Sequence, residues 1–204
     1  MKTRIVLIRH GQTVWNRENR FRGQLNPALD EVGLQQAEAT ARAVAARWPV
    51  VAVYSSPLGR AVKTAEAIAR AQGLTAQPLP ALLDIHFGEL QGLRGEDAYA
   101  RWPELVRAWV EAPHTVRFPG GEGLDDVRSR VTAGVDEIVA RHPGESVALV
   151  SHTVVNRVLL CAVLGLGNEH FWRLEQETCA INVFDVKEDG TRVLVLMNDT
   201  CHLQ

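Results

Sequence analysis

The chain has 204 residues, of which 46% are apolar and 23% are charged, as is usual for a globular protein with a buried core. Its formal net charge of −2 gives no overall attraction to nucleic acid or to an acidic membrane surface. No stretch reaches the roughly 18–20 apolar residues that cross a bilayer, and the apolar run after the first charges is too short for a signal peptide. Any anion site must therefore come from a local group of basic residues.

The cysteine and histidine spacings give no sign of disulfides or of a metal centre. The three cysteines, Cys161, Cys179 and Cys201, are an odd number and include no CxxC pair. The chain also contains no HxH or HExxH spacing. We therefore expect a cytoplasmic protein that needs no metal or other cofactor.

Apolar runs of strand length alternate with stretches of helical periodicity along the chain. Between residues 84 and 121 the pattern becomes irregular, with only short helical pieces. In chain order, the expected elements are a strand over 5–8, a helix over 34–48, a strand over 50–54, a helix over 58–69, a strand over 74–79, short helices over 96–102 and 103–111, a helix over 124–141, a strand over 146–150, a helix over 154–164, and a closing hairpin of strands 181–186 and 193–197.

This alternation predicts an α/β fold, a three-layer αβα sandwich in which helices cover both faces of a mostly parallel sheet. We expect one domain over residues 1–204, with an excursion at about 84–121 that forms a lid and selects the substrate. In sheets of this kind, ligands bind beyond the carboxyl ends of the strands. Polar residues that directly follow a predicted strand are therefore the candidates for a functional site.

Two predicted strands end on a histidine. "VLIRHG" brings His10 to the end of the first strand, and "VALVSHT" brings His152 to the end of another. A third strand ends in "VYSSPLGR", which places Arg60 one turn into the following helix, near a positive helix N-terminus. The basic and amide residues gathered near these strand ends are Arg9, His10, Asn16, Arg60 and His152.

This set of residues has the chemistry of a phosphoryl-transfer site. Two guanidinium groups can clamp a phosphate, one imidazole nitrogen can attack phosphorus, and a second imidazole can stabilise the transition state. A single histidine is more often a packed core or surface residue, and the residue pattern alone leaves both interpretations open for His10 and His152. For the histidines away from these strand ends we expect the structural or surface role; they are His86, His114, His142 and His170.

Six segments resemble, in the same order, the sequence blocks of the histidine phosphatase family, also called the phosphoglycerate mutase-like family. Together they cover nearly the whole chain. They are "LIRHGQTVWN", "RFRGQLNPALDEVGLQQAEATA", "VYSSPLGRAVKTAEAI", "LLDIHFGELQGL", "FPGGEGLDDVRSRV" and "VALVSHT". The resemblance implies that His10 is the nucleophile that becomes phosphorylated. It also implies that Arg9, Arg60 and His152 bind the phosphate, and that Asn16 is a further group of the pocket.

The resemblance implies three further contacts with the substrate. Arg22 and Gln24 are expected at the edge of the pocket, although a solvated loop charge explains Arg22 equally well. Thr153 stands where the family usually has glycine, and it narrows the turn beside His152.

The family's general acid is usually a glutamate, and Asp84 stands at that position. This residue would protonate the leaving alkoxide and later deprotonate the attacking water. Aspartate is one methylene shorter, so its loop must sit closer to the phosphate. Glu89 is the alternative acid.

The chain is shorter than the family's cofactor-dependent mutases and resembles its phosphatase branch. We therefore expect a metal-independent phosphomonoesterase, a histidine acid-type phosphatase that hydrolyses a small phosphorylated metabolite through a phosphohistidine. The alternatives are a phosphoglycerate mutase and a non-catalytic relative that binds a phosphorylated ligand. The segments "RAWVEAPHTVRFPGGE" and "NDTCHL" most resemble bacterial metal-independent phosphoserine phosphatases.

Two features bear on that last comparison. A histidine that helps to read the substrate usually follows the acidic loop in those enzymes, but Phe87 holds that position here and His86 precedes it. His202 either approaches the pocket or packs as a tail residue.

Neutral His10 is needed for attack and protonated His152 favours phosphate binding, so we expect a pH optimum between mildly acidic and neutral.

The expected partner is a small phosphomonoester, with no nucleic acid and no membrane. The apolar strand over 193–197 fits either a homodimer contact or the edge of a sheet within one chain.

Overall fold

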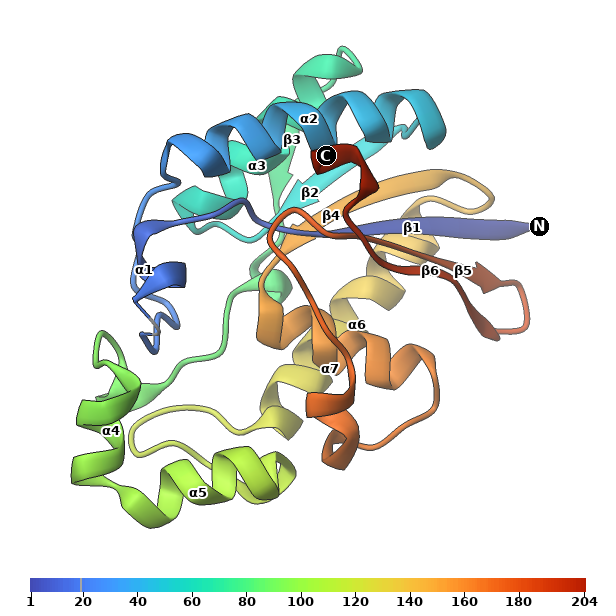
Figure 1. Cartoon of the computed structure of the whole chain (residues 1–204). Helices are drawn as coiled ribbons and strands as arrows, with labels where there is room; N and C mark the ends of the chain where they lie inside the picture. The colour runs from blue at the N-terminus through green and yellow to red at the C-terminus, as the bar shows by residue number, and fades with distance from the viewer. Residues whose placement is uncertain (19) are drawn as a thin grey trace.

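The computed structural model describes residues 1–18 and 20–204 and has a six-stranded sheet with helices on both faces (Figure 1). The strand order is β3-β2-β4-β1-β5-β6. Four parallel strands form one part of the sheet: β1 (Lys2–Arg9), β2 (Ala52–Ser55), β3 (Ala76–Pro78) and β4 (Ser146–Ser151). The hairpin of β5 (Ile181–Lys187) and β6 (Arg192–Asp199) adds two antiparallel strands beside β1. The predicted αβα sandwich with a mostly parallel sheet is confirmed.

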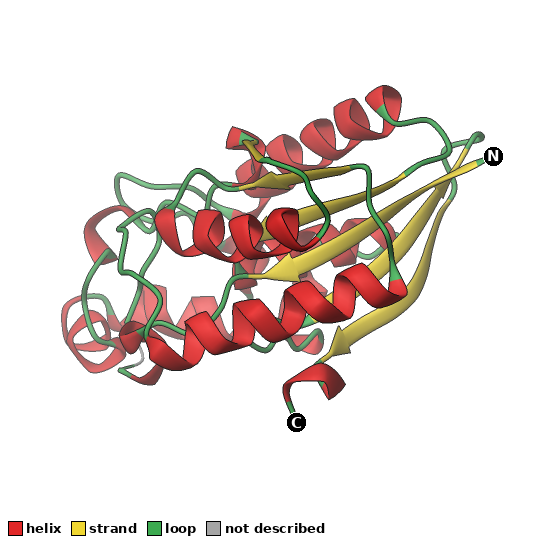
Figure 2. Cartoon of the chain, turned by 90° about the horizontal axis from the view of Figure 1, so that it is seen from above, coloured by secondary structure: helices red, strands yellow, loops and turns green. Residues whose placement is uncertain are grey.

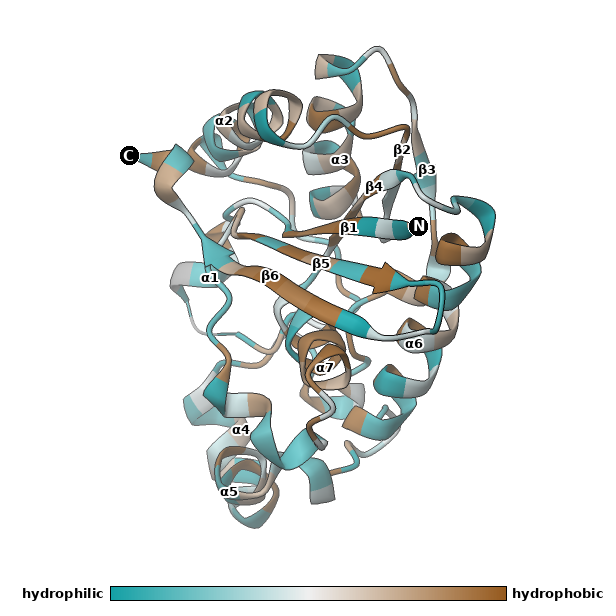
Figure 3. Ribbon diagram, turned by 90° about the vertical axis from the view of Figure 1, so that its right-hand side faces the viewer, coloured by the Kyte–Doolittle hydropathy of each residue, from teal (hydrophilic) through white to brown (hydrophobic). Residues whose placement is uncertain are grey.

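Four long helices form the two outer layers (Figures 1 and 2). One face is covered by α2 (Glu31–Arg47) and α3 (Gly59–Ala71), and the other by α6 (Leu124–Arg141) and α7 (Thr153–Val163). The alternating residues of β1 divide between the two cores: Ile5 and Leu7 pack on the α6 and α7 side, and Val6 and Ile8 on the other. A strand buried on both faces explains the unbroken apolar run "IVLI" and the apolar colour of the central strands in Figure 3.

The short helices gather mainly at one end of the molecule. There α4 (Gly95–Arg101) and α5 (Pro103–Glu111) lie beyond α7, in the excursion expected from the irregular sequence pattern (Figure 1). The remaining short elements are α1 (Val14–Arg17), η1 (Pro80–Leu82), η2 (Gly88–Leu90), η3 (Pro113–Thr115), η4 (Asn168–Arg173) and η5 (Cys201–Leu203).

The α2 helix begins earlier than predicted, because a capping side chain precedes its first apolar residue. The expected helix over 34–48 begins at Glu31, because the Asp30 side chain accepts a hydrogen bond from Gly33 N–H at 2.9 Å. The expected boundaries of α5 and α6 agree with the structure at both ends.

The β6 strand forms one edge of the sheet, and apolar side chains on it are partly exposed; they are Val193, Val195 and Met197. A homodimer through this strand stays a prediction. In the part of the chain that the structure describes, no helix combines the length and apolarity needed to cross a membrane.

Candidate active site

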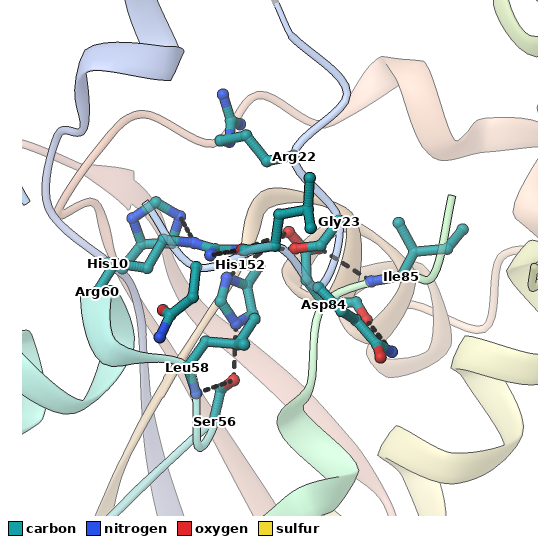
Figure 4. Close-up of polar contacts among 12 residues, drawn as sticks. His10, Arg22, Gly23, Ser56, Leu58, Arg60, Asp84, Ile85 and His152 are labelled. Carbon is teal, nitrogen blue, oxygen red and sulfur yellow. Dashed lines mark hydrogen bonds and ion pairs between the residues drawn. The ribbon is translucent and has the colours of Figure 1, made fainter. Parts of the chain in front are cut away.

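The register of two neighbouring strands brings the two histidines together. Arg9 of β1 pairs with Ser151 of β4, so His10 and His152 follow their strands side by side at the carboxyl edge of the sheet. The His10 N–H donates to the Ser151 carbonyl at 3.0 Å. The centroids of the two imidazole rings are 5.1 Å apart (Figure 4). The paired histidines predicted from the strand ends therefore share one site.

A close backbone approach fixes the turn after His10. A Cβ atom on Gly11 would lie 2.5 Å from the Gly33 carbonyl oxygen, and one on Gly33 would lie 2.1 Å from the Gln12 carbonyl oxygen. Both contacts are too short for any residue but glycine. The loop after β1 therefore rests directly on the first turn of α2, and this contact holds the backbone of His10 in place.

The hydrogen bonds of His10 define its tautomer. Its Nδ1 lies 2.7 Å from the Gly11 carbonyl, which can only accept, so Nδ1 carries the proton and Nε2 keeps its lone pair. Arg60 Nε donates to that nitrogen at 3.3 Å. Burial, followed by the charges of Arg60 and Arg9, lowers the pKa of His10 well below its usual value. The imidazole is therefore neutral, and its unprotonated Nε2 accepts the hydrogen bond from Arg60.

His152 is held by a residue that the sequence pattern did not assign. β2 pairs with β4, and Ser56, one residue beyond β2, has its Oγ 2.8 Å from His152 Nε2. Among the described residues, His152 Nδ1 has no hydrogen-bond partner, and it lies 3.7 Å from Asp84 Oδ2. Burial, then Arg60, lowers the pKa of His152 well below its usual value. The imidazole is thus neutral in the structure, and the protonated form expected when phosphate binds stays a prediction.

Arg60 is fully buried at the second position of α3, where main-chain oxygens fix its guanidinium. It donates to the Leu25 carbonyl at 2.8 Å, to the Gly23 carbonyl at 2.8 Å and to Asp84 Oδ2 at 3.1 Å. These bonds hold its Nε toward His10 (Figure 4).

Arg9 supplies a second buried cation. Its Nη1 donates to the Gln176 carbonyl at 2.5 Å, while its Nε is buried with no partner in the described part of the chain. Burial, followed by the charge of Arg22, lowers the pKa of Arg9 to about 9, so it is still charged at neutral pH.

Asp84 lies among these cations despite its short side chain. Its Oδ1 accepts from the Ile85 N–H at 3.0 Å, and its Oδ2 accepts from Arg60. Its main-chain carbonyl accepts from Gln24 Nε2 at 3.1 Å and from Arg130 Nη2 at 3.2 Å, which draws the loop inward. Burial outweighs the opposing charge of Arg60 and raises the pKa of Asp84. The alternative acid, Glu89, has an exposed side chain on η2.

A cavity of about 330 Å³ lies beside this site, and three residues expected in the site line it: Arg22, Asp84 and Thr153. Its lining does not include Arg9, His10, Arg60 or His152, so Asp84 connects the cavity to these groups. Asn16 and Gln24 do not line this cavity. The Asn16 Oδ1 accepts from Thr13 N–H at 2.9 Å and from Thr13 Oγ1 at 2.7 Å, which caps α1.

The histidines left open by the sequence lie away from the cavity. His202 Nε2 is 2.9 Å from Thr40 Oγ1, so the tail packs on α2 and does not line the cavity. His86 Nδ1 accepts from the Gly88 N–H at 3.0 Å. Phe87, in contrast, lines the cavity. In the described ranges 1–18 and 20–204, no three or more His, Cys, Asp or Glu side chains form a group suited to a metal ion.

Replacing Ser56 with alanine is expected to lower kcat/KM for a phosphomonoester about tenfold, because His152 loses the contact that orients its ring. The pH dependence of the activity should shift at the same time, which a purely structural contact would not cause. Steady-state kinetics between pH 5 and pH 8 measure both effects. Wild-type kinetics in the variant would contradict a positioning role.

The neutral, buried state of His10 predicts a pH effect on stability. Its folded pKa is lowered, so the unfolded chain binds more protons as the pH falls below about 6.5, and folding stability decreases there. A His10→Gln variant should lose less stability than wild type between pH 7 and pH 5. The difference can reach about 1.4 kcal/mol per pH unit. Urea unfolding at the two pH values measures it, and equal losses would argue against a neutral buried His10.

Comparison with known proteins agrees with this geometry. A model of the histidine phosphatase superfamily (branch 1) matches residues 5–200. Phosphoserine phosphatase 1 of Hydrogenobacter thermophilus is 36% identical over 200 residues, which are 98% of this chain and 94% of that protein. The metal-independent phosphoserine phosphatase of Arabidopsis thaliana is 38% identical over 159 residues, 77% of this chain and 67% of that protein.

A solved structure of a phosphatase is also similar to this chain. The structure of mycobacterial glucosyl-3-phosphoglycerate phosphatase complexed with VO3 has a TM-score of 0.88 and 32% identity, and the match covers 97% of this chain and 99% of that chain. The chain therefore belongs to the histidine phosphatase superfamily (branch 1), and the family predicted from its six sequence blocks is confirmed. This membership and the relatives named as phosphatases support a phosphoric monoester hydrolase.

Proposed function

We propose that the protein is a metal-independent phosphomonoesterase that uses His10 as its nucleophile. The observation that carries the proposal is the unprotonated Nε2 of His10, which lies within reach of a buried arginine and a second imidazole. In the first step this nitrogen forms a bond to phosphorus while the ester P–O bond breaks. Asp84 gives its proton to the leaving alkoxide, which departs as the alcohol.

The second step regenerates the enzyme. A water molecule attacks the phosphorus of the phosphohistidine, Asp84 takes a proton from that water, and the P–N bond breaks to release inorganic phosphate. Burial raises the pKa of Asp84, which favours the protonated form that the acid role needs more than in an ordinary aspartate.

The cations supply the electrostatic stabilisation. Arg9 and Arg60 would bind the non-bridging oxygens of the phosphoryl group, and the unpartnered Nδ1 of His152 would donate to one of them once protonated. A phosphate dianion between these groups raises the pKa of His152, so substrate binding itself would favour the protonated imidazole. Asn16, Gln24 and Arg22 would support this arrangement from the edge of the site.

The segment over residues 84–121 would act as the wall of the substrate pocket within a single domain over residues 1–204. Phosphate release from phenyl phosphate in excess EDTA tests the proposal. Steady release by wild type is expected, because no step needs a metal. A folded protein that releases no phosphate, or one that does so only after a divalent metal is restored, would contradict it.

A further inference from the structure

The cavity beyond the catalytic groups is lined mainly by apolar side chains. We call its five rings the aromatic wall; they are Phe21, Phe87, Trp109, Phe171 and Trp172. Three aliphatic side chains complete the apolar lining: Val106, Val110 and Val154. The volume of about 330 Å³ is within the range of small-ligand sites, roughly 300–1,000 Å³.

The aromatic wall is a packed unit. Trp109 lies at its centre, with ring centroids 6.1 Å from Phe87, 5.2 Å from Phe171 and 5.6 Å from Trp172. Phe21 packs edge-on against Phe87 at 5.1 Å. The Trp172 Nε1 donates to the Trp109 carbonyl at 2.7 Å, so this donor is already used within the wall. These contacts make the wall a preformed surface for an apolar group.

The charged residues that line the cavity are mostly cationic. Three arginines line it, Arg20, Arg22 and Arg157, and the one acidic residue in its lining is Asp84, which already bonds to Arg60. A positively charged leaving group would therefore meet like charges and find no free carboxylate in this lining.

Arg157 also occupies the aromatic faces that attract cations. Its guanidinium carbon lies 5.3 Å from the Phe171 ring centroid and 4.9 Å from that of Trp172. It donates to Glu175 at 3.0 Å, but the Glu175 side chain is 72% exposed. An ammonium group would thus compete with Arg157 for these rings, and Glu175 offers only a solvent-screened charge.

We infer that this protein acts on phosphomonoesters whose leaving alcohol is apolar, aromatic in preference, and carries no ammonium group. The inference rests on the proposed phosphatase function and names its substrate class. It separates this chain from a phosphoserine phosphatase, because phosphoserine carries an ammonium group and no apolar body. Phe87 adds an apolar ring to the lining next to Asp84.

A matched series of alkyl esters tests the inference, because their leaving alcohols differ little in acidity. The series is propyl, phenylpropyl and aminopropyl phosphate, with phosphoserine as the fourth substrate. We expect kcat/KM for phenylpropyl phosphate at least about tenfold above that for propyl phosphate. Aminopropyl phosphate should lie at least about tenfold below propyl phosphate, and phosphoserine, which has no apolar body, below phenylpropyl phosphate.

Two variants test whether the cavity causes this preference for an apolar leaving group. Val106→Asp puts a carboxylate in the cavity, and Val139→Asp makes the same change at a half-buried valine of α6 outside it. The ratio of phenylpropyl to aminopropyl kcat/KM should fall about tenfold in Val106→Asp and stay near wild type in Val139→Asp.

Three results would overturn the inference. The first is a higher kcat/KM for phosphoserine or aminopropyl phosphate than for phenylpropyl phosphate in wild type. The second is an equal change of the ratio in both variants. The third is that no ester is hydrolysed, phenyl phosphate included; this result would contradict the phosphatase function itself, and the inference with it.

Discussion

The His10→Ala variant is expected to release phosphate from phenyl phosphate at least about 10³-fold more slowly than wild type. The variant keeps the anion site of Arg9, Arg60 and His152 but has no nitrogen to attack phosphorus. It should therefore still bind inorganic phosphate, which separates loss of chemistry from loss of the site. Steady-state phosphate release and phosphate binding by calorimetry measure the two properties.

His142→Ala is the matched control. His142 is half-buried and, like His10, hydrogen-bonded, but its partners Tyr54 and Glu145 lie outside the cavity lining, with Nε2 at 3.0 Å from Tyr54 Oη. This variant should lose some stability and keep its turnover. Comparable activity in His10→Ala and wild type would exclude His10 as the nucleophile.

The Asp84→Asn variant is expected to lower kcat for an alkyl phosphate by about 10²–10⁴-fold, because the amide cannot protonate the leaving alkoxide. The loss should shrink to about tenfold or less for dinitrophenyl phosphate, whose leaving group needs no proton. The asparagine keeps the shape of the side chain, but its single oxygen can accept from only one of the two donors, Arg60 and Ile85. Kinetics with both substrates measure the difference.

Glu89→Gln is the control for this experiment, since Glu89 was the alternative acid and is exposed on η2. Its kcat should be unchanged with both substrates. If Glu89→Gln shows the leaving-group dependence and Asp84→Asn does not, the acid has been assigned to the wrong residue.

The sheet and the paired histidines could be predicted because each depends on a local pattern. An unbroken apolar run marks a strand buried on both faces, and the residue that ends it lies at the carboxyl edge. Adjacent parallel strands then place His10 next to His152 without any information beyond the strand order. That order came from the structure, whereas the family resemblance implied that His10 and His152 act on one phosphate and supplied the position of Asp84.

Other parts of the site depend on contacts between distant residues, which no local pattern reveals. Ser56 reaches His152 only because β2 pairs with β4. Arg9 donates to the main-chain carbonyl of Gln176, so the identity of the Gln176 side chain does not predict this contact. The neutral state of His152 depends on burial and on Arg60 together, and the sequence shows neither.

The aromatic wall is a further example. Its five rings come from four separate places in the chain, because only Phe171 and Trp172 are neighbours in the sequence. In the structure Trp109 lines the cavity, whereas Trp102, the residue between α4 and α5, packs partly buried against the core.

The covalent intermediate tests the central claim most directly. Wild type would be mixed rapidly with phenyl phosphate, quenched in alkali, where phosphohistidine survives, and digested for mass spectrometry. The expected result is one added phosphoryl group on the peptide that contains His10, absent from the His10→Ala variant. Turnover without any phosphorylated peptide, or a phosphoryl group on another residue such as His152, would contradict the account.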